Sequence, residues 1–141
     1  MKISDLLRGK GSNVITTPAD ATVRELVASL AEHGIGALVV VDGPTVLGIV
    51  SERDIVVRLN DWGDTLLDKL ARDLMTSSLF TCRPEDDVDR IAETMTERRV
   101  RHMPVFNGDD LVGLVSIGDV VKSRIEQLEH DRGQLEHYIT G

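Results

Sequence analysis

Cysteine is almost absent from this sequence, which has Cys82 alone among 141 residues. A single cysteine excludes an internal disulfide framework. Long apolar runs are also absent, because no stretch approaches the ~20 residues that a membrane-spanning helix requires. The first residues lack the apolar core and the cleavage site of a signal peptide. These absences predict a cytoplasmic protein with no membrane partner.

Basic residues are scarce, with 16 Lys and Arg against 24 Asp and Glu, for a net charge of −8. Binding to nucleic acid or to an anionic membrane requires a basic face, so neither partner is expected. Catalytic motifs are missing as well: the sequence has no G-x-S-x-G, no P-loop and no H-E-x-x-H. Its four histidines lack the spacing of metal ligands. We therefore expect no enzyme activity and no metal site.

What the sequence does contain is an internal repeat. The segment Gly48-Ile-Val-Ser51-Glu-Arg-Asp54 recurs 65 residues later as Gly113-Leu-Val-Ser116-Ile-Gly-Asp119. The two halves align at this offset without a gap from residue 14 to residue 57. A repeat of this length indicates two copies of one structural unit.

Each copy predicts the order strand, helix, strand, strand, helix. Apolar periodicity, helix caps and tight turns define these elements. In the first copy the strands are expected at 14–17, 37–41 and 46–50, with helices starting after Thr22 and at Ser51. In the second copy they are expected at 79–82, 103–106 and 111–115, with helices capped by Asp87 and Ser116.

The repeat divides the chain into a first unit at 1–61, a linker at 62–71, a second unit at 72–122 and a C-terminal helix at 123–141. The linker is expected to hold a short helix at 66–71. The last helix carries a heptad stripe, with Gly133 as a weak point. The stripe consists of Val121, Ile125, Leu128, Arg132, Leu135 and Ile139.

The S-x-x-D junction of each copy has two interpretations. The first is a helix N-cap, in which the Ser oxygen accepts an N–H of the first turn and the Asp reaches back. The second is a nucleotide site, in which the helix N-terminus and the Ser meet phosphate and the Asp accepts ribose hydroxyls. In the second interpretation, Gly48 and Gly113 let the ligand approach the backbone closely. Both interpretations can hold for the same residues.

The sequence resembles a tandem pair of cystathionine β-synthase (CBS) domains, also called a Bateman module. The resemblance rests on the two repeated phrases, on Arg101-His-Met-Pro104-Val105 and on Arg72-Asp-Leu-Met-Thr76, and it covers residues 2–122. It implies an α/β (α+β) fold in which two β-α-β-β-α units pack about a pseudo-twofold axis, followed by a C-terminal helical extension.

The resemblance also implies two clefts that bind adenosine-containing ligands. Ser51 and Ser116 would meet phosphate, and Asp54 and Asp119 the ribose. The first cleft would further include Ile15, Thr17, Ile35, Ala37 and Arg53. The second would include Phe80, Cys82, Val100, Arg101, His102, Met103 and Pro104. The clefts differ chemically, since Val39 stands in place of Pro104 and Gly118 in place of Arg53.

The resulting hypothesis is a non-enzymatic regulatory protein that senses the energy or redox state through an adenosine nucleotide. AMP is the first expected ligand, followed by ADP, ATP, NAD(H) and S-adenosylmethionine. The alternative is a ligand-free structural or adaptor protein acting through its helical faces and tail. An enzyme acting on a bound nucleotide is a weaker third possibility. Excess apolar residues on the helices after Ser51 and Ser116 predict a homodimer, and the downstream protein partner is unknown.

Overall fold

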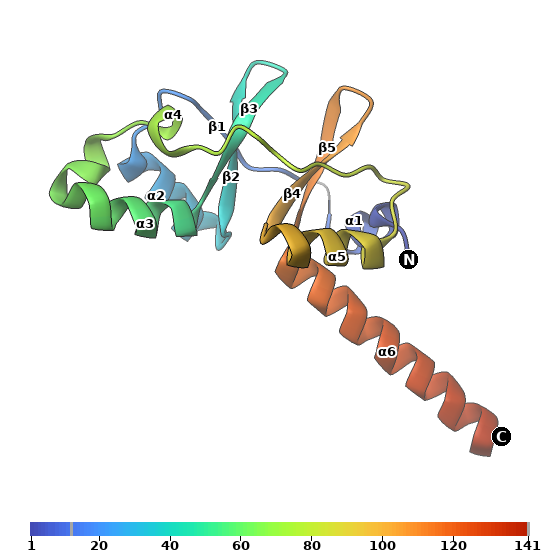
Figure 1. The fold of residues 1–141 in the computed structure, drawn as a ribbon. Coiled ribbons are helices and arrows are strands. Elements are labelled where there is room, and N and C mark those ends of the chain that lie inside the picture. Colours follow the sequence, from blue (N-terminus) through green and yellow to red (C-terminus); the bar gives the residue numbers. More distant parts are fainter. Residues whose placement is uncertain (12, 141) are drawn as a thin grey trace. The chain divides into compact units, whose positions relative to one another are not determined.

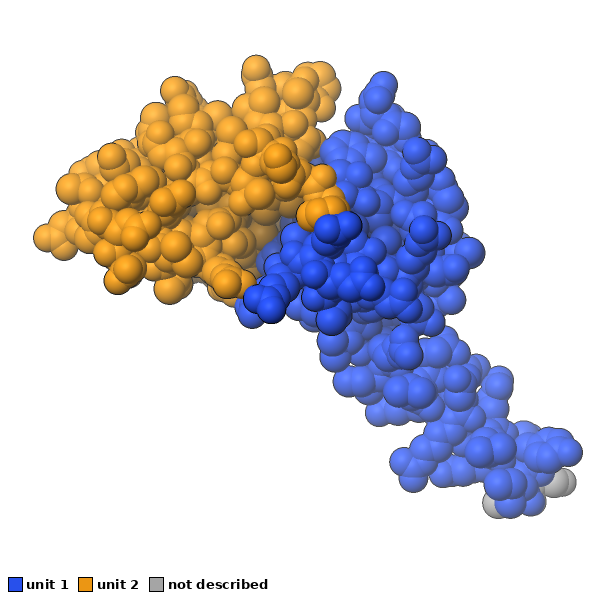
Figure 2. All heavy atoms as spheres, in the orientation of Figure 1, with its two compact units in different colours: residues 1–12, 81–141 blue, residues 13–80 orange. Residues whose placement is uncertain are grey.

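The computed structural model describes residues 1–11 and 13–140, with the side chain of residue 140 left out. The chain forms two units (Figure 2): unit 1 contains residues 1–12 and 81–141, and unit 2 contains residues 13–80. These units differ from the predicted ones in the segments that precede the repeats. Residues 1–12 belong to the unit that is built from the second repeat, and residues 72–80 belong to the unit that is built from the first.

Unit 2 contains a three-stranded sheet in the order β1 (Thr16–Pro18), β2 (Ala37–Asp42) and β3 (Thr45–Ser51). β1 runs parallel to β2, and β3 runs antiparallel to it. The helix between β1 and β2, α2 (Val23–His33), begins at the predicted Thr22 cap and ends at Gly34 in the left-handed conformation. The strands and helices predicted for the first repeat are thus confirmed.

The rest of unit 2 follows β3 as α3 (Glu52–Trp62), a 3-10 helix η1 (Gly63–Asp68) and α4 (Ala71–Leu74) (Figure 1). The single linker helix predicted at 66–71 is therefore wrong, because a 3-10 turn ends at Asp68 and a new helix begins at Ala71. Both segments contribute to the core. The buried core of unit 2 consists of Ala21, Val23, Leu26, Leu30, Leu38, Val40, Val50, Leu66, Ala71 and Leu74.

Unit 1 is built from α1 (Ile3–Lys10), α5 (Val88–Arg98), β4 (His102–Asn107), β5 (Asp110–Ser116) and α6 (Ile117–Thr140). β4 and β5 form an antiparallel pair, as predicted. The predicted strand at 79–82 is reduced to one bridge between Cys82 and Val105. It stops there because the Arg83 N–H bonds the Asp86 carboxylate at 2.8 Å, which turns the chain away from β4.

The start of α5 also differs from the prediction. Asp87 occupies the N-cap position, but its side chain makes no capping hydrogen bond. Its carboxylate instead pairs with Lys2 Nζ at 2.9 Å. This pair lies beside a backbone hydrogen bond from the Val88 N–H to the Met1 carbonyl at 3.0 Å. Asp87 therefore helps to attach the N-terminal segment to unit 1.

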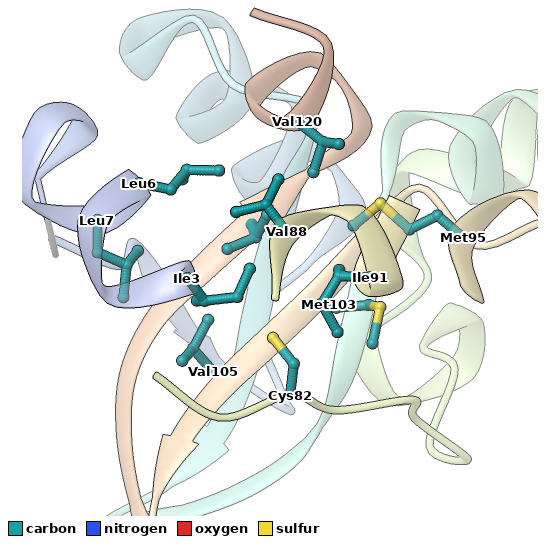
Figure 3. Close-up of a cluster of buried hydrophobic side chains, with 11 residues drawn as sticks. Ile3, Leu6, Leu7, Cys82, Val88, Ile91, Met95, Met103, Val105 and Val120 are labelled. Carbon is teal, nitrogen blue, oxygen red and sulfur yellow. The ribbon is translucent and has the colours of Figure 1, made fainter. Parts of the chain in front are cut away.

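α1 completes the core of unit 1 (Figure 3). Ile3, Leu6 and Leu7 lie among side chains of α5, β4, β5 and the first turn of α6. Backbone hydrogen bonds from Ile3 to Asp86 and from Ser4 to Pro84, both 2.9 Å, fix the start of the helix. The other buried members of this core are Cys82, Val88, Ile91, Met95, Met103, Val105, Val115 and Val120.

Candidate functional site

The Ser–Asp junction of unit 2 lies where β3 ends and α3 begins. Ser51 pairs with Ala37 across the sheet, and the Glu52 N–H donates to the Gly36 carbonyl at 2.9 Å. The Asp54 N–H donates to Ser51 Oγ at 3.2 Å, and the Ser51 N–H donates to Asp54 Oδ2 at 2.8 Å. The Ser51 hydroxyl also donates to Asp54 Oδ2, at 2.9 Å. This hydroxyl is therefore already engaged.

The junction of unit 1 repeats this arrangement between β5 and α6. Ser116 pairs with His102, and the Ile117 N–H donates to the Arg101 carbonyl at 2.8 Å. The Asp119 N–H donates to Ser116 Oγ at 3.1 Å, and the Ser116 N–H donates to Asp119 Oδ2 at 2.8 Å. The N-cap interpretation is thus confirmed in both units. The nucleotide interpretation of the same residues stays a prediction.

The two junctions differ in the surroundings of the Asp. Lys10 Nζ donates to Asp119 Oδ2 and, at 2.7 Å, to the Leu114 carbonyl. Burial of the Asp119 carboxylate acts to raise its pKa, but hydrogen bonds from Lys10 and Ser116 outweigh burial and lower the pKa. Within the described part of the chain, Asp54 forms no ion pair. Lys10 therefore balances the charge of the Asp119 carboxylate, whereas the Asp54 carboxylate has no such ion pair among the described residues.

The glycines of the two repeated phrases do not leave room for a ligand. A Cβ on Gly48 would lie 2.6 Å from the Thr76 carbonyl oxygen, and a Cβ on Gly113 would lie 2.7 Å from Leu7 Cδ2. The lack of a side chain at each glycine thus allows close packing of the segment that precedes the other repeat, Thr76 at Gly48 and Leu7 at Gly113. The interpretation of these glycines as openings for a ligand is wrong, because protein atoms already fill the space beside them.

Several predicted contact residues lie beside these junctions along the backbone. Ile15 accepts a hydrogen bond from the Val39 N–H at 3.3 Å, and Thr17 pairs with Val40 in β1. The Pro104 carbonyl accepts the Cys82 N–H at 3.0 Å. Ile15, Thr17, Ile35, Val100 and His102 are half-buried, whereas Arg53, Phe80 and Arg101 are exposed.

Four other predicted contact residues, Ala37, Cys82, Met103 and Pro104, are buried. The side chains of Cys82 and Met103 belong to the core of unit 1 (Figure 3), so their side chains point into packed protein. Burial, followed by the nearby charge of Asp86, raises the pKa of the Cys82 thiol to about 12. Cys82 is therefore a neutral core residue at physiological pH.

Lys10 is the site residue that sequence reasoning missed. It lies outside the gapless repeat and more than a hundred positions from Asp119, so neither spacing nor periodicity indicates the pair. Among the described residues, no group of three or more His, Cys, Asp or Glu side chains is placed to hold a metal ion.

The helical faces of the two units carry grooves of different chemistry. In unit 2, α2 and α3 enclose an apolar groove of about 540 Å³ whose lining includes Val27, Leu30, Ile35 and Val56. In unit 1, the groove between α5 and α6 is lined by Asp89, Glu93 and Glu97 together with Arg124. The two units are thus similar in fold and unlike in surface chemistry.

The family model for the CBS domain matches residues 3–61 and again residues 71–126. The chain belongs to the CBS domain family. A CBS-domain protein of Agrobacterium tumefaciens has a solved structure with a TM-score of 0.86 and 39% identity, over 88% of this chain and 99% of that one. The solved structure of a putative signal-transduction protein with CBS domains from Burkholderia ambifaria has a TM-score of 0.85 and 35% identity, over 89% of this chain and 95% of that one.

Among curated proteins, a mitochondrial CBS domain-containing protein of Arabidopsis thaliana is 34% identical over 99% of this chain and 72% of its own length. The predicted CBS pair and its α+β fold with a C-terminal helix are therefore confirmed. Within the described residues, none of the helices of this CBS pair combines the length and hydrophobicity needed to cross a membrane.

Proposed function

We propose that this CBS pair is a non-enzymatic regulatory protein that binds an adenosine nucleotide, with AMP as the first candidate. CBS pairs are in general regulatory and ligand-binding. The observation that carries the proposal is the Ser–Asp junction, present in both units with the same backbone geometry. In this proposal the protein is a cytoplasmic homodimer, and a downstream protein binds it in response to the nucleotide.

Unit 1 offers the better mononucleotide site. The Ser116 oxygen accepts the Asp119 N–H, which leaves its hydroxyl proton for a ligand phosphate. Asp119 Oδ2 takes the hydrogen bonds from Ser116 and Lys10, so Oδ1 can accept a ribose hydroxyl. In unit 2 the Ser51 hydroxyl already donates to Asp54 and must rotate before it can donate to phosphate.

Positive charge supports an anionic ligand in unit 1. The N-terminus of α6 provides the partial positive charge of the helix dipole beside Ser116. Arg101 lies directly before β4, and His102, the first residue of β4, pairs with Ser116. In unit 2 the equivalent positions are Gly36 and Ala37, which carry no charge. At these two positions a phosphate therefore gains more from unit 1, whereas unit 2 has Arg53 in place of Gly118.

A thermal scan tests the proposal. At a ligand concentration 100 times the dissociation constant, mass action stabilises the fold by about 2.7 kcal/mol. For a chain of this size that equals a rise in Tm of roughly 5–10 °C. We expect this rise with millimolar AMP, or with ADP, ATP, NAD(H) or S-adenosylmethionine if one of these is the ligand. No rise with any of the five would contradict the proposal and favour the ligand-free adaptor.

A further inference from the structure

The C-terminal helix α6 carries an apolar stripe that unit 1 leaves uncovered. The stripe, named here the α6 stripe, consists of Val121, Ile125, Leu128, Leu135 and Ile139, which are each 50% to 73% exposed. Val120 and Ser123, which lie off the stripe on another face of the helix, are buried against unit 1. Beyond its first turns α6 extends away from α1 and α5 (Figure 1). Exposed apolar side chains at heptad spacing are typical of a helix that pairs with another helix.

We propose that the α6 stripe pairs with the α6 stripe of a second copy of this chain, in an antiparallel helix pair about a two-fold axis. Ile125 then lies opposite the partner's Leu128, and by symmetry Leu128 lies opposite the partner's Ile125. This inference goes beyond nucleotide binding and does not depend on it. It also specifies which residues meet, which the homodimer proposal alone does not.

The charges that flank the stripe select this register. Lys122 lies beside the partner's Glu129, and Arg124 lies beside the partner's Asp131, so both of these contacts join opposite charges. The two-fold axis repeats both contacts. A register shifted by one heptad would place Lys122 beside the partner's Glu136, but also Glu129 beside the partner's Glu129 and Asp131 beside the partner's Asp131. The two like-charge contacts offset the attraction and disfavour that arrangement.

A parallel pair is also disfavoured by charge. It would place Arg124 beside the partner's Glu129, but it would also place Arg132 against the partner's Arg132 within the stripe and Asp131 beside the partner's Glu136. In the antiparallel pair Arg132 lies opposite the partner's Val121. Arg132 Nε already bonds Glu136 Oε1 of its own helix at 3.2 Å, which holds the guanidinium at the edge of the stripe. Arg124 contacts Asp89 of its own unit, and its further N–H donors remain for the partner's Asp131.

The surface at the start of the stripe fits this register independently of charge. A groove of about 510 Å³ lies over Gly118, with walls formed by Ile117, Val121, Lys122, Ile125 and Glu126. The antiparallel register places the partner's Leu135 opposite Gly118. Since glycine has no side chain, the leucine can enter between the walls as a knob enters a hole. The first repeat has Arg53 at this position, so only the second repeat provides the hole.

Two single cysteine variants of the full chain test the arrangement. A Cβ on Gly118 meets only Ser116 Oγ, at an ordinary 3.6 Å, so Gly118→Cys is accommodated. Leu135 is exposed, and Leu135→Cys removes no core contact. The native Cys82 is buried and its pKa is about 12, so it does not exchange under mild oxidation. Each variant is expressed alone, and the two are also co-expressed with different tags.

We expect a disulfide-linked dimer only when the two variants are co-expressed, with Gly118→Cys of one chain joined to Leu135→Cys of the other. In the antiparallel pair each variant alone has its two cysteines about 26 Å apart along the helices, since 17 residues rise about 1.5 Å each. A disulfide requires Cα atoms within about 7 Å. Cross-linking of each variant with itself would show a parallel pair. No cross-linking in the mixture would show that the stripes do not meet. Either result overturns the proposal.

A charge exchange provides a second readout. Lys122→Glu should weaken the tail pairing about tenfold, because two attractive contacts become repulsive. Adding Glu129→Lys to the same chain should restore the pairing, since the contact is then attractive with the signs reversed. Gln134→Glu, on the outer face of α6, is the control and should change nothing. Failure of the double variant to recover the cross-linked yield would contradict the register.

Discussion

The ammonium group of Lys10, at the end of α1, donates a hydrogen bond to the carboxylate of Asp119 in the first turn of α6. The side chains are 34% and 23% exposed, so water screens the pair only in part. The contact joins the start of the chain to the residue proposed to hold the ribose. It links the stability of unit 1 to the electrostatics of its candidate site.

This ion pair should make the stability of the protein depend on pH. The pKa of Asp119 is lowered below its ordinary value of 3.8, so the contribution of the pair is complete above pH 3.8 and is lost as the pH falls through the folded-state pKa. Lys10→Met should therefore cost about 1 kcal/mol near pH 7. The difference from the parent chain should shrink below pH 3.8 in urea unfolding.

Arg8→Met is the control on the same helix. Arg8 pairs with Asp5 at the surface and is 76% exposed. Such pairs contribute about 0.5 kcal/mol or less. A loss on Lys10→Met that stays constant from pH 7 to pH 3 would show that the effect comes from packing of the lysine chain and not from the charge.

The preference for unit 1 as the nucleotide site can be measured by calorimetry. Asp119→Ala should weaken AMP binding by about 1–3 kcal/mol, because hydrogen bonds to a carboxylate are lost. Asp54→Ala removes the equivalent cap from α3 and is the matched control for the loss of helix stability. If Asp54→Ala weakens AMP binding and Asp119→Ala does not, unit 2 holds the nucleotide.

The glycines of the repeated phrases should tolerate alanine differently. In Gly48→Ala the new Cβ meets the Thr76 carbonyl oxygen, which accepts the Ile49 N–H at 3.0 Å, while the Thr76 N–H donates to the Ile49 carbonyl at 2.9 Å. We expect a loss of about 3 kcal/mol, at the upper end for overpacking. In Gly113→Ala the new Cβ meets Leu7, a side chain that can shift, so about 1–2 kcal/mol is expected.

Gly133→Ala is the control for this pair of variants. Gly133 lies within α6, and nothing comes within 4 Å of an added Cβ. Alanine should therefore stabilise the helix by up to about 1 kcal/mol. All three variants are compared by urea unfolding. Equal losses for Gly48→Ala and Gly113→Ala would show that the backbone at Thr76 yields as readily as the side chain of Leu7.

Local sequence signals predicted most of the elements correctly, because each depends on neighbouring residues. The Thr22 cap and Gly34 define α2, and Asp42-Gly43 and Asn107-Gly108 mark the two hairpins. The Ser116 junction was predicted as a helix start for the same reason. The wrong strand at 79–82 shows the limit of such signals, since the competing bond from Arg83 to Asp86 decides where the chain turns.

Contacts between distant residues were beyond prediction from one sequence. The apolar side chain of Leu7 would suit the core of either unit. Nothing in the local sequence indicates that it packs on Gly113 and not on Gly48. The pairing of Lys10 with Asp119 depends on that same packing. The fold class therefore followed from local patterns and resemblance, whereas the electrostatic difference between the two sites required the three-dimensional arrangement.

The placement of α1 in unit 1 has a consequence for synthesis on the ribosome. Unit 2 is continuous in sequence from residue 13 to residue 80 and can fold as soon as it emerges. α1 is made before it, yet the core that buries Ile3 ends only with Val120. At ribosomal rates the delay is roughly 5–20 s. Through that interval α1 is exposed and available to chaperones, and it enters its core only after the whole of unit 2 has been made.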